Sequence, residues 1–231
     1  MAGWTKADYD AAYRFRVSRY FGGTAEGESE VKCHYHKWAM QPILQNMWSV
    51  LAPILNIASS EYVCVVGAGF GWGVEAFIAE TGATTVGIDI SEYIAAEQAN
   101  TEEAELRAEI TAAGFDPDTG KGATILAGIY DGQPRSNVII LENDASTGPQ
   151  RNEVRVALGN NWPSVVVYED LIDDTWTDTD IENARNAGNG FAGSQRLIFI
   201  ARPTASRSLQ DIQTAALGAE VISPDGGVYL T

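Results

Sequence analysis

The sequence predicts an α/β protein with a mostly parallel sheet that helices cover on both faces. Short apolar runs rich in β-branched residues alternate with segments of helical periodicity, and the connections between them are short. A length of 231 residues with 45% apolar residues is enough for one substantial core. Near the end of the chain, a turn sequence between two short apolar runs predicts an antiparallel hairpin.

Two helices are expected before the first strand. Apolar residues recur at three- and four-residue spacing over 5–21 and again over 37–56. We expect residues 1–59 to form an N-terminal helical cap and residues 60–231 to form the main α/β domain. Most aromatic residues of the cap are expected to pack on the sheet, and one or two would line a pocket for a planar or cationic substrate.

The alternating units follow from residue 62 onward. Strands are predicted over 62–66, 84–90, 137–141, 164–168 and 196–201, and helices over 72–81, 91–114, 150–158, 180–187 and 209–217. The stretch from Asp116 to Pro134 is predicted to be an irregular insertion. The last two strands are expected at 219–222 and 228–230, on either side of the turn sequence Pro224-Asp-Gly-Gly227.

Charge and composition exclude several classes of protein. Fifteen Lys and Arg oppose thirty-one Asp and Glu, and this net charge of -16 disfavours a general nucleic-acid binder. The chain has no run of eighteen apolar residues, which a membrane-spanning helix would need. Charged residues occur within the first twenty positions, where a signal peptide needs an apolar stretch. We therefore expect a cytoplasmic, acidic protein whose two cysteines, Cys33 and Cys64, are reduced thiols.

Four glycines at alternate positions follow the first strand directly. Gly67, Gly69, Gly71 and Gly73 would let a ligand approach the backbone, while the next helix offers free N–H groups and a positive dipole end. The alternative is a tight turn that serves only strand-to-helix packing. A dinucleotide fingerprint G-x-G-x-x-G would need a small residue at position 72, which is Trp72.

This glycine loop, together with Asp89 in the sequence Gly-Ile-Asp-Ile-Ser, resembles motif I and the following acidic motif of class I S-adenosylmethionine-dependent methyltransferases. Glu142-Asn-Asp-Ala145 resembles the adenine-binding Asp-Ala pair of that Rossmann-like superfamily, and the terminal hairpin resembles its reversed seventh strand, which dinucleotide-binding sheets lack. The resemblance covers 60–231. It implies S-adenosylmethionine as the cofactor and methyl transfer as the activity.

The resemblance also implies roles for individual residues. The loop residues Gly67, Ala68, Gly69 and Gly71 would pass under the methionine and ribose of the cofactor. Asp89 would accept both ribose hydroxyls, Ile90 would pack on the adenine, and Asp144 with the backbone of Ala145 would read the adenine edge. A carboxylate at the end of a parallel strand is a two-oxygen acceptor suited to a diol.

Two points leave these roles open. Asp89 has the alternative role of capping the predicted helix that begins at Ser91. Val65 stands two residues before the first glycine, where the family often has Asp or Glu. A contact that orients the charged end of the cofactor is therefore missing or supplied elsewhere.

The candidate catalytic groups are acids after the fourth strand and a histidine near the N-terminus. Glu169 and Asp170 fall where the family's substrate-facing motif lies, as base or anchor for a substrate amine, with solvated loop acids as the alternative. His36 is a candidate base or substrate contact, and a surface imidazole is the alternative. The acids over 169–182 fit no EF-hand loop, and His34 and His36 lack further zinc ligands, so no metal site is predicted.

Together these features predict an S-adenosylmethionine-dependent methyltransferase that acts on a small molecule. The chain lacks the Asn/Asp-Pro-Pro-Tyr pattern of enzymes that methylate exocyclic amines of bases, which adds to the charge-based case against nucleic acid. One alternative is a non-catalytic methyltransferase-like binding protein, suggested by Val65. The other is an NAD-dependent oxidoreductase, which Trp72 and the terminal hairpin oppose.

Overall fold

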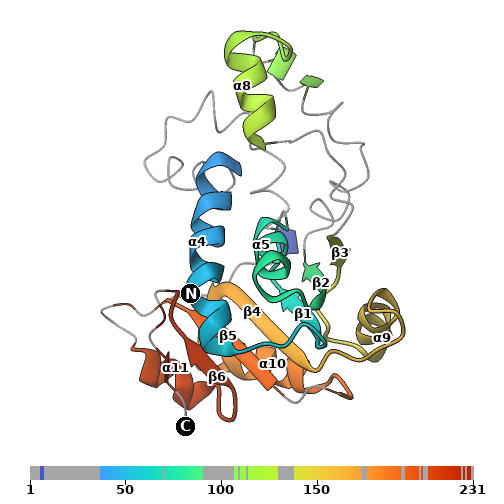
Figure 1. Ribbon diagram of the computed structural model, residues 1–231, viewed down its shortest axis with the longest axis vertical. Helices are drawn as coiled ribbons and strands as arrows, with labels where there is room; N and C mark the ends of the chain where they lie inside the picture. Colours follow the sequence, from blue (N-terminus) through green and yellow to red (C-terminus); the bar gives the residue numbers. More distant parts are fainter. Residues whose placement is uncertain are drawn as a thin grey trace.

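A computed structural model shows a single seven-stranded sheet with helices on both faces (Figure 1). It describes residues 6–7, 37–69, 71–90, 107–108, 110–112, 114–129, 138–172, 176–193, 196–202, 204, 208–224, 226 and 228–229. The predicted helix over 5–21 therefore lies outside the described residues except for Lys6 and Ala7, which are helical.

The strand order is β3-β2-β1-β4-β5-β6-β7. The strands are β1 (Tyr62–Val66), β2 (Thr84–Asp89), β3 (Ile139–Glu142), β4 (Val165–Ile172), β5 (Arg196–Ala201), β6 (Glu220–Ile222) and β7 (Val228–Tyr229). All neighbours from β3 to β6 pair in parallel, whereas β7 runs antiparallel to β6. The order reverses between β1 and β4, and ligands of open parallel sheets bind at such a switch point.

The position of β6 changes one inference from the sequence. β6 pairs directly with β5, through Phe199 and Val221 among others, and β7 is added at the outer edge of the sheet. The first six strands thus have the order 3-2-1-4-5-6, which is also the order of doubly wound dinucleotide-binding sheets. The end of the chain therefore does not oppose an oxidoreductase, contrary to the inference from the sequence.

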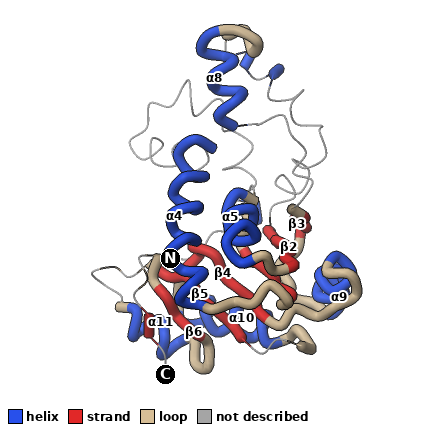
Figure 2. Tube along the Cα trace, in the orientation of Figure 1, coloured by secondary structure: helices blue, strands red, loops and turns tan. Residues whose placement is uncertain are grey.

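Alternation along the strands sends side chains into two separate layers of core. On one face, Val63, Val65 and Val167 pack against α4 (Lys37–Leu55) and α5 (Trp72–Thr81). On the other face, Cys64 and Val166 pack against α9 (Gly148–Ala157), α10 (Asp178–Asn189) and α11 (Leu209–Ala215). This period-two pattern explains why the central strands are apolar on both sides, and it confirms the predicted fold class (Figure 2).

Helix α4 is built into the same core as the sheet. Its residues Met47, Trp48 and Leu51 are at most 5% exposed and pack with the strands and α5. The division of the chain at residue 59 stays a prediction, and the described part of the first segment packs directly on the sheet.

The helix boundaries follow ordinary capping chemistry. Thr147, Thr177 and Ser208 each accept a hydrogen bond from the third residue of their helix and complete a capping box. Helix α5 ends at Thr81, as the sequence predicted, and its C-cap residue Gly82 has a left-handed φ of 68°. The predicted helix over 91–114 lies largely outside the described residues, but its end is a Schellman turn in which Gly114 donates to Thr111 and Phe115 donates to Ile110.

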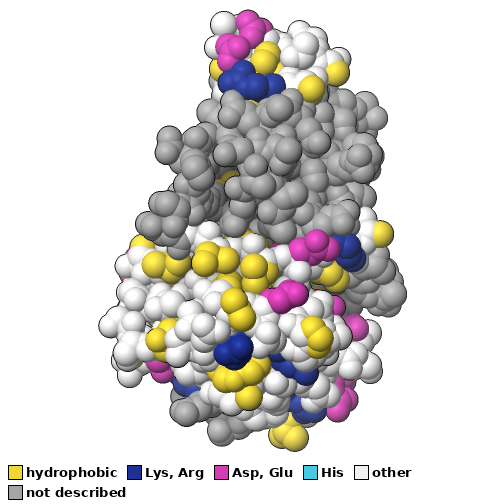
Figure 3. Space-filling model, turned by 90° about the vertical axis from the view of Figure 1, so that its right-hand side faces the viewer, with side chains coloured by type: hydrophobic (Ala, Val, Ile, Leu, Met, Phe, Trp, Pro, Cys, Tyr) yellow, Lys and Arg dark blue, Asp and Glu magenta, His cyan; other side chains and the backbone are white. Residues whose placement is uncertain are grey.

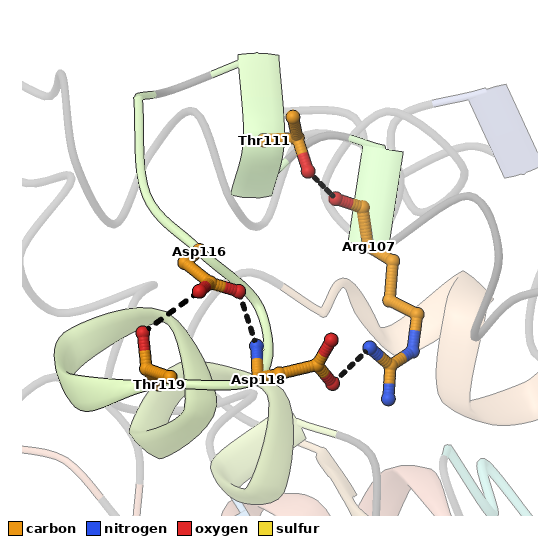
Figure 4. A network of polar contacts seen from close by, with 5 residues as sticks. All are labelled: Arg107, Thr111, Asp116, Asp118 and Thr119. Atoms are coloured by element: carbon orange, nitrogen blue, oxygen red, sulfur yellow. Dashed lines mark hydrogen bonds and ion pairs between the residues drawn. The ribbon is translucent and has the colours of Figure 1, made fainter.

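The predicted irregular insertion contains a helix, so that prediction was wrong in part. Helix α8 (Gly120–Ile129) stands apart from the sheet, beyond the far end of α4 (Figure 1). Ahead of it, Asp116 accepts hydrogen bonds from the backbone of Asp118 and the hydroxyl of Thr119, while Arg107 pairs with Asp118 at 2.6 Å (Figure 4). These hydrogen bonds and this ion pair hold the turn that precedes α8, in a segment that was predicted to be irregular.

Figure 3 shows acidic, basic and apolar side chains mixed over the described surface of one side of the molecule. Among the described residues, no helix combines the length and the apolar character that crossing a membrane requires.

Candidate functional site

The glycine loop lies at the carboxyl ends of β1 and β2, next to the switch point. Gly67, Gly69 and Gly71 have φ of 80°, 49° and 79°, a left-handed conformation that glycine adopts at little cost. The N–H groups of Gly67 and Ala68 both donate to the carbonyl oxygen of Ile88, at 2.9 and 3.0 Å. The loop is therefore held down on the end of β2, and α5 begins immediately after it.

A glycine in β2 makes this close approach possible. A Cβ atom at Gly87 would lie 2.6 Å from the Cβ of Ala68, closer than real side chains come. The sequence offered a signal for this position, because a glycine inside a buried strand often marks a close backbone approach. Gly87 had no role among the residues predicted for the site.

Asp89 connects the loop to the end of β2. Its side chain is 6% exposed, and its Oδ2 accepts a hydrogen bond from the N–H of Gly69 at 3.0 Å. The structure thus brings together two residues that the sequence assigned to one cofactor. Ser91, the residue that Asp89 was alternatively expected to help cap, lies outside the described residues.

A tightly bonded turn follows β3 and faces the same edge. Asn143 is 2% exposed and accepts from the N–H of Ala145 at 2.7 Å, while its amide donates to the Gln150 carbonyl and to Glu153. Its own N–H donates to the carbonyl of Asp89 at 2.7 Å, which ties the turn to β2. Asn143 was not among the predicted site residues, although an Asn beside a strand end is a common turn former.

The predicted adenine-reading pair lies in this turn. Ala145 has a φ of 57°, which is uncommon for a residue with a Cβ, and its carbonyl accepts from Arg151 at 2.7 Å. Asp144 is exposed, and its Oδ1 accepts from the N–H of Ser146 at 2.9 Å. The turn therefore presents a carboxylate and backbone groups in a fixed geometry near the end of β2.

A lysine from the N-terminal segment reaches the same edge. The ammonium of Lys6 donates to the carbonyl of Ile90 at 3.1 Å and pairs with Glu142 at 2.6 Å. Through Lys6, the described part of the predicted N-terminal cap thus contacts the ends of β2 and β3. Ile90 itself is half-buried.

A second buried carboxylate lies on the opposite side of the loop. Glu169 is 4% exposed, and its Oε1 accepts a hydrogen bond from the indole N–H of Trp48 at 2.5 Å. A Cβ added at Gly73 in the first turn of α5 would overlap the Glu169 carboxylate, so the acid packs directly on that backbone. Trp48 is held in turn by an edge-to-face contact with Phe77 at 4.7 Å.

The structure corrects the predicted surroundings of Glu169. Strand β4 does not end at Tyr168 but continues to Ile172, with a shift of register against β5 between these two residues. Glu169 is therefore a buried strand residue, and the alternative of a solvated loop acid was wrong for it. Tyr168 faces the opposite layer, where its hydroxyl donates to the Ala184 carbonyl and burial raises its pKa.

The other predicted catalytic residues are less defined. Asp170 belongs to β4, and its side chain is not among those described. His36 lies outside the described residues. Among the side chains that are described, no group of three or more His, Cys, Asp or Glu gathers in a way that would hold a metal ion.

Comparison with known proteins adds little to this geometry. No protein-family model and no curated protein matches the chain. Among solved structures, the alcohol dehydrogenase of the hyperthermophilic archaeon Aeropyrum pernix is 12% identical with a TM-score of 0.37, over 90% of this chain and 47% of that one. YjhP of E. coli is 14% identical with a TM-score of 0.29, over 79% of this chain and 54% of that one.

The chain thus spans about half the length of each of these two proteins. Likeness at this level carries no argument about function. The functional proposal therefore rests on the site itself.

Proposed function

We propose that the chain binds S-adenosylmethionine at the carboxyl edge of β1, β2 and β3 and transfers its methyl group to a small molecule. The observation that carries this proposal is the pair of buried carboxylates, Asp89 and Glu169, on the two sides of the glycine loop. Asp89 is the acceptor for the ribose diol, and the turn of Asp144 and Ala145 reads the adenine. The methyl donor supplies the sulfonium methyl when it is bound.

Of the two carboxylates, Glu169 disfavours a dinucleotide. In a dinucleotide-binding sheet, the pyrophosphate lies on the first turn of the helix that follows the glycine loop. Here the Glu169 carboxylate packs against Gly73 in that turn. Like charges repel strongly where little water screens them, so a doubly charged pyrophosphate would meet an unfavourable field. S-Adenosylmethionine carries no phosphate.

An NAD-dependent oxidoreductase remains the second candidate, because the strand order of the first six strands also suits a dinucleotide. Calorimetric titration with S-adenosylhomocysteine and with NAD separates the two. We expect saturable binding of S-adenosylhomocysteine and a rise in melting temperature, since a ligand that binds only the folded state stabilises it by mass action. Binding of NAD alone would reverse the assignment.

Activity needs a separate test, because a non-catalytic binding protein would also bind the cofactor. Incubation with S-adenosylmethionine and a library of small nucleophiles should release S-adenosylhomocysteine with at least one of them. Cofactor binding without turnover by any acceptor would favour the binding protein. We favour small acceptors because the net charge of -16 repels nucleic acid.

A further inference from the structure

Val65 leaves the glycine-loop motif without its usual acid, and a carboxylate on the neighbouring strand lies close to that position. Val65 is fully buried on β1 and pairs in register with Val167 of β4. Both face the core beneath α4 and α5. Glu169 is two residues further along β4, about 7 Å nearer the carboxyl edge. Its contacts with Trp48 and Gly73 show that it faces the same layer.

We propose that Glu169 binds the cationic amino end of the cofactor, in place of the acid that position 65 lacks. This inference rests on the proposed function and refines it, because it gives Glu169 a role in cofactor binding rather than in proton transfer. The ligand end that it recognises is an α-amino acid group, which carries one ammonium and one carboxylate.

The chemistry of the α5 N-terminus explains why such a ligand needs a protein acid. The first N–H groups and the dipole of α5 attract anions and disfavour cations. Taken without Glu169, that helix end suits the carboxylate of an amino acid but not its ammonium. The Glu169 carboxylate against Gly73 offers the ammonium a charge-assisted hydrogen bond at the same end of the helix. The pair of groups therefore matches a zwitterion.

Two neighbours of Glu169 suit a carboxylate oxygen that accepts hydrogen bonds. The indole N–H of Trp48 can only donate, and at 2.5 Å from Oε1 it stabilises a charged oxygen. The N-terminal end of α5 acts in the same direction. The competing explanation is structural: Glu169 would serve only to anchor α4 to β4 through Trp48.

Glu169→Gln separates these two roles. Glutamine keeps the volume and an oxygen that accepts from Trp48, and it removes the charge. The probes are S-adenosylhomocysteine, which carries the amino acid group, and 5′-methylthioadenosine, which lacks it. We expect the variant to bind S-adenosylhomocysteine at least about tenfold more weakly and to bind 5′-methylthioadenosine within about twofold of the wild type. Glu80→Gln, an exposed change at the far end of α5, is the matched control.

Unchanged affinity for S-adenosylhomocysteine in Glu169→Gln would overturn the inference, and so would an equal loss for both probes. Failure of the wild type to bind either probe would instead contradict the proposed function. If Glu169→Gln does not fold, Gly73→Ala provides a second test, since its Cβ displaces the carboxylate. The wild type alone gives a third: S-adenosylhomocysteine should bind at least about tenfold more tightly than its analogue without the α-amino group, and equal binding contradicts the role of Glu169.

Discussion

Replacing Asp89 tests whether one carboxylate both holds the glycine loop and binds the ligand. In the folded protein, Asp89 Oδ2 accepts from the Gly69 N–H at 3.0 Å, and the side chain is 6% exposed. A hydrogen bond to a charged group contributes about 1.5–3 kcal/mol, more than a neutral one. Because Asp89→Ala also removes the desolvation cost of a buried carboxylate, it should lower the free energy of unfolding by somewhat less, about 1–2 kcal/mol, even without ligand.

The cost to the ligand should be larger. A carboxylate that accepts both ribose hydroxyls contributes about 2–3 kcal/mol to binding, which corresponds to roughly 30- to 150-fold in the dissociation constant. Asp89→Asn keeps one acceptor for Gly69 and should lose stability by less than about 1 kcal/mol. It should still bind S-adenosylhomocysteine more weakly, because its amide group replaces a second acceptor by a donor.

A double-mutant cycle identifies the groups involved. The wild type and Asp89→Ala are each titrated with S-adenosylhomocysteine and with its 2′-deoxy analogue, and Glu80→Gln serves as the exposed control. We expect the 2′-hydroxyl to improve binding to the wild type and to make little difference in Asp89→Ala. If the 2′-hydroxyl contributes equally in both proteins, Asp89 does not bind the ribose, and its role is confined to the loop.

Three further predictions concern the surroundings of the site. Asn143→Ala should lower the free energy of unfolding by about 1–3 kcal/mol in denaturant titrations, because the fully buried Ala145 N–H loses its acceptor. A loss below about 0.5 kcal/mol is typical of surface substitutions and would show that Asn143 does not hold the turn. Burial raises the pKa of the Cys64 thiol. In a Cys33→Ser variant, a thiol reagent at mildly alkaline pH should therefore label no cysteine until the protein is unfolded. Rapid labelling of the folded variant would contradict this burial. Hydrogen bonds from the Asp118 backbone and Thr119 lower the pKa of Asp116 below 3.8. The ionised Asp116 side chain therefore stabilises the folded protein above that pH, and this stabilisation is lost as the pH falls through the lowered pKa. Asp116→Ala should have a lower melting temperature than the wild type at neutral pH, and the two melting temperatures should converge in acid.

The fold was predictable because the signals for its elements are local and agree with the packing. The run from Tyr62 to Val66 is buried on both faces in a central parallel strand, and the glycine at position 82 ends α5 with a left-handed φ. The ends of β2 and β3 were placed within a few residues for the same reason. Where several weak local preferences point to one structure, sequence alone carries the prediction.

The sequence did not predict contacts that depend on distant residues. The order of β5 and β6 is set by pairing across the sheet, which leaves no periodic signal in either segment. Arg196 and Glu220, joined by two hydrogen bonds of 2.7 and 2.9 Å, support that pairing from 24 residues apart. The burial of Glu169 likewise depends on Trp48, which is 121 residues away and gives no signal of this contact in the sequence.

The buried Glu169 gives a reason why a sheet with dinucleotide order need not bind a dinucleotide. Strand order determines where a ligand lies, because the switch point and the loop N–H groups are backbone features. Side chains determine which charge that place accepts. Glu169 puts an acid against a helix N-terminus that alone would attract phosphate, whereas Asp89 bonds to the loop at Gly69 and suits a ribose in either kind of cofactor. Under the proposed function, the site takes a ligand with hydroxyls near Asp89 and an ammonium near Glu169. Glu169→Gln should therefore weaken binding of the amino-bearing ligand and also reduce the discrimination against phosphate-bearing ligands.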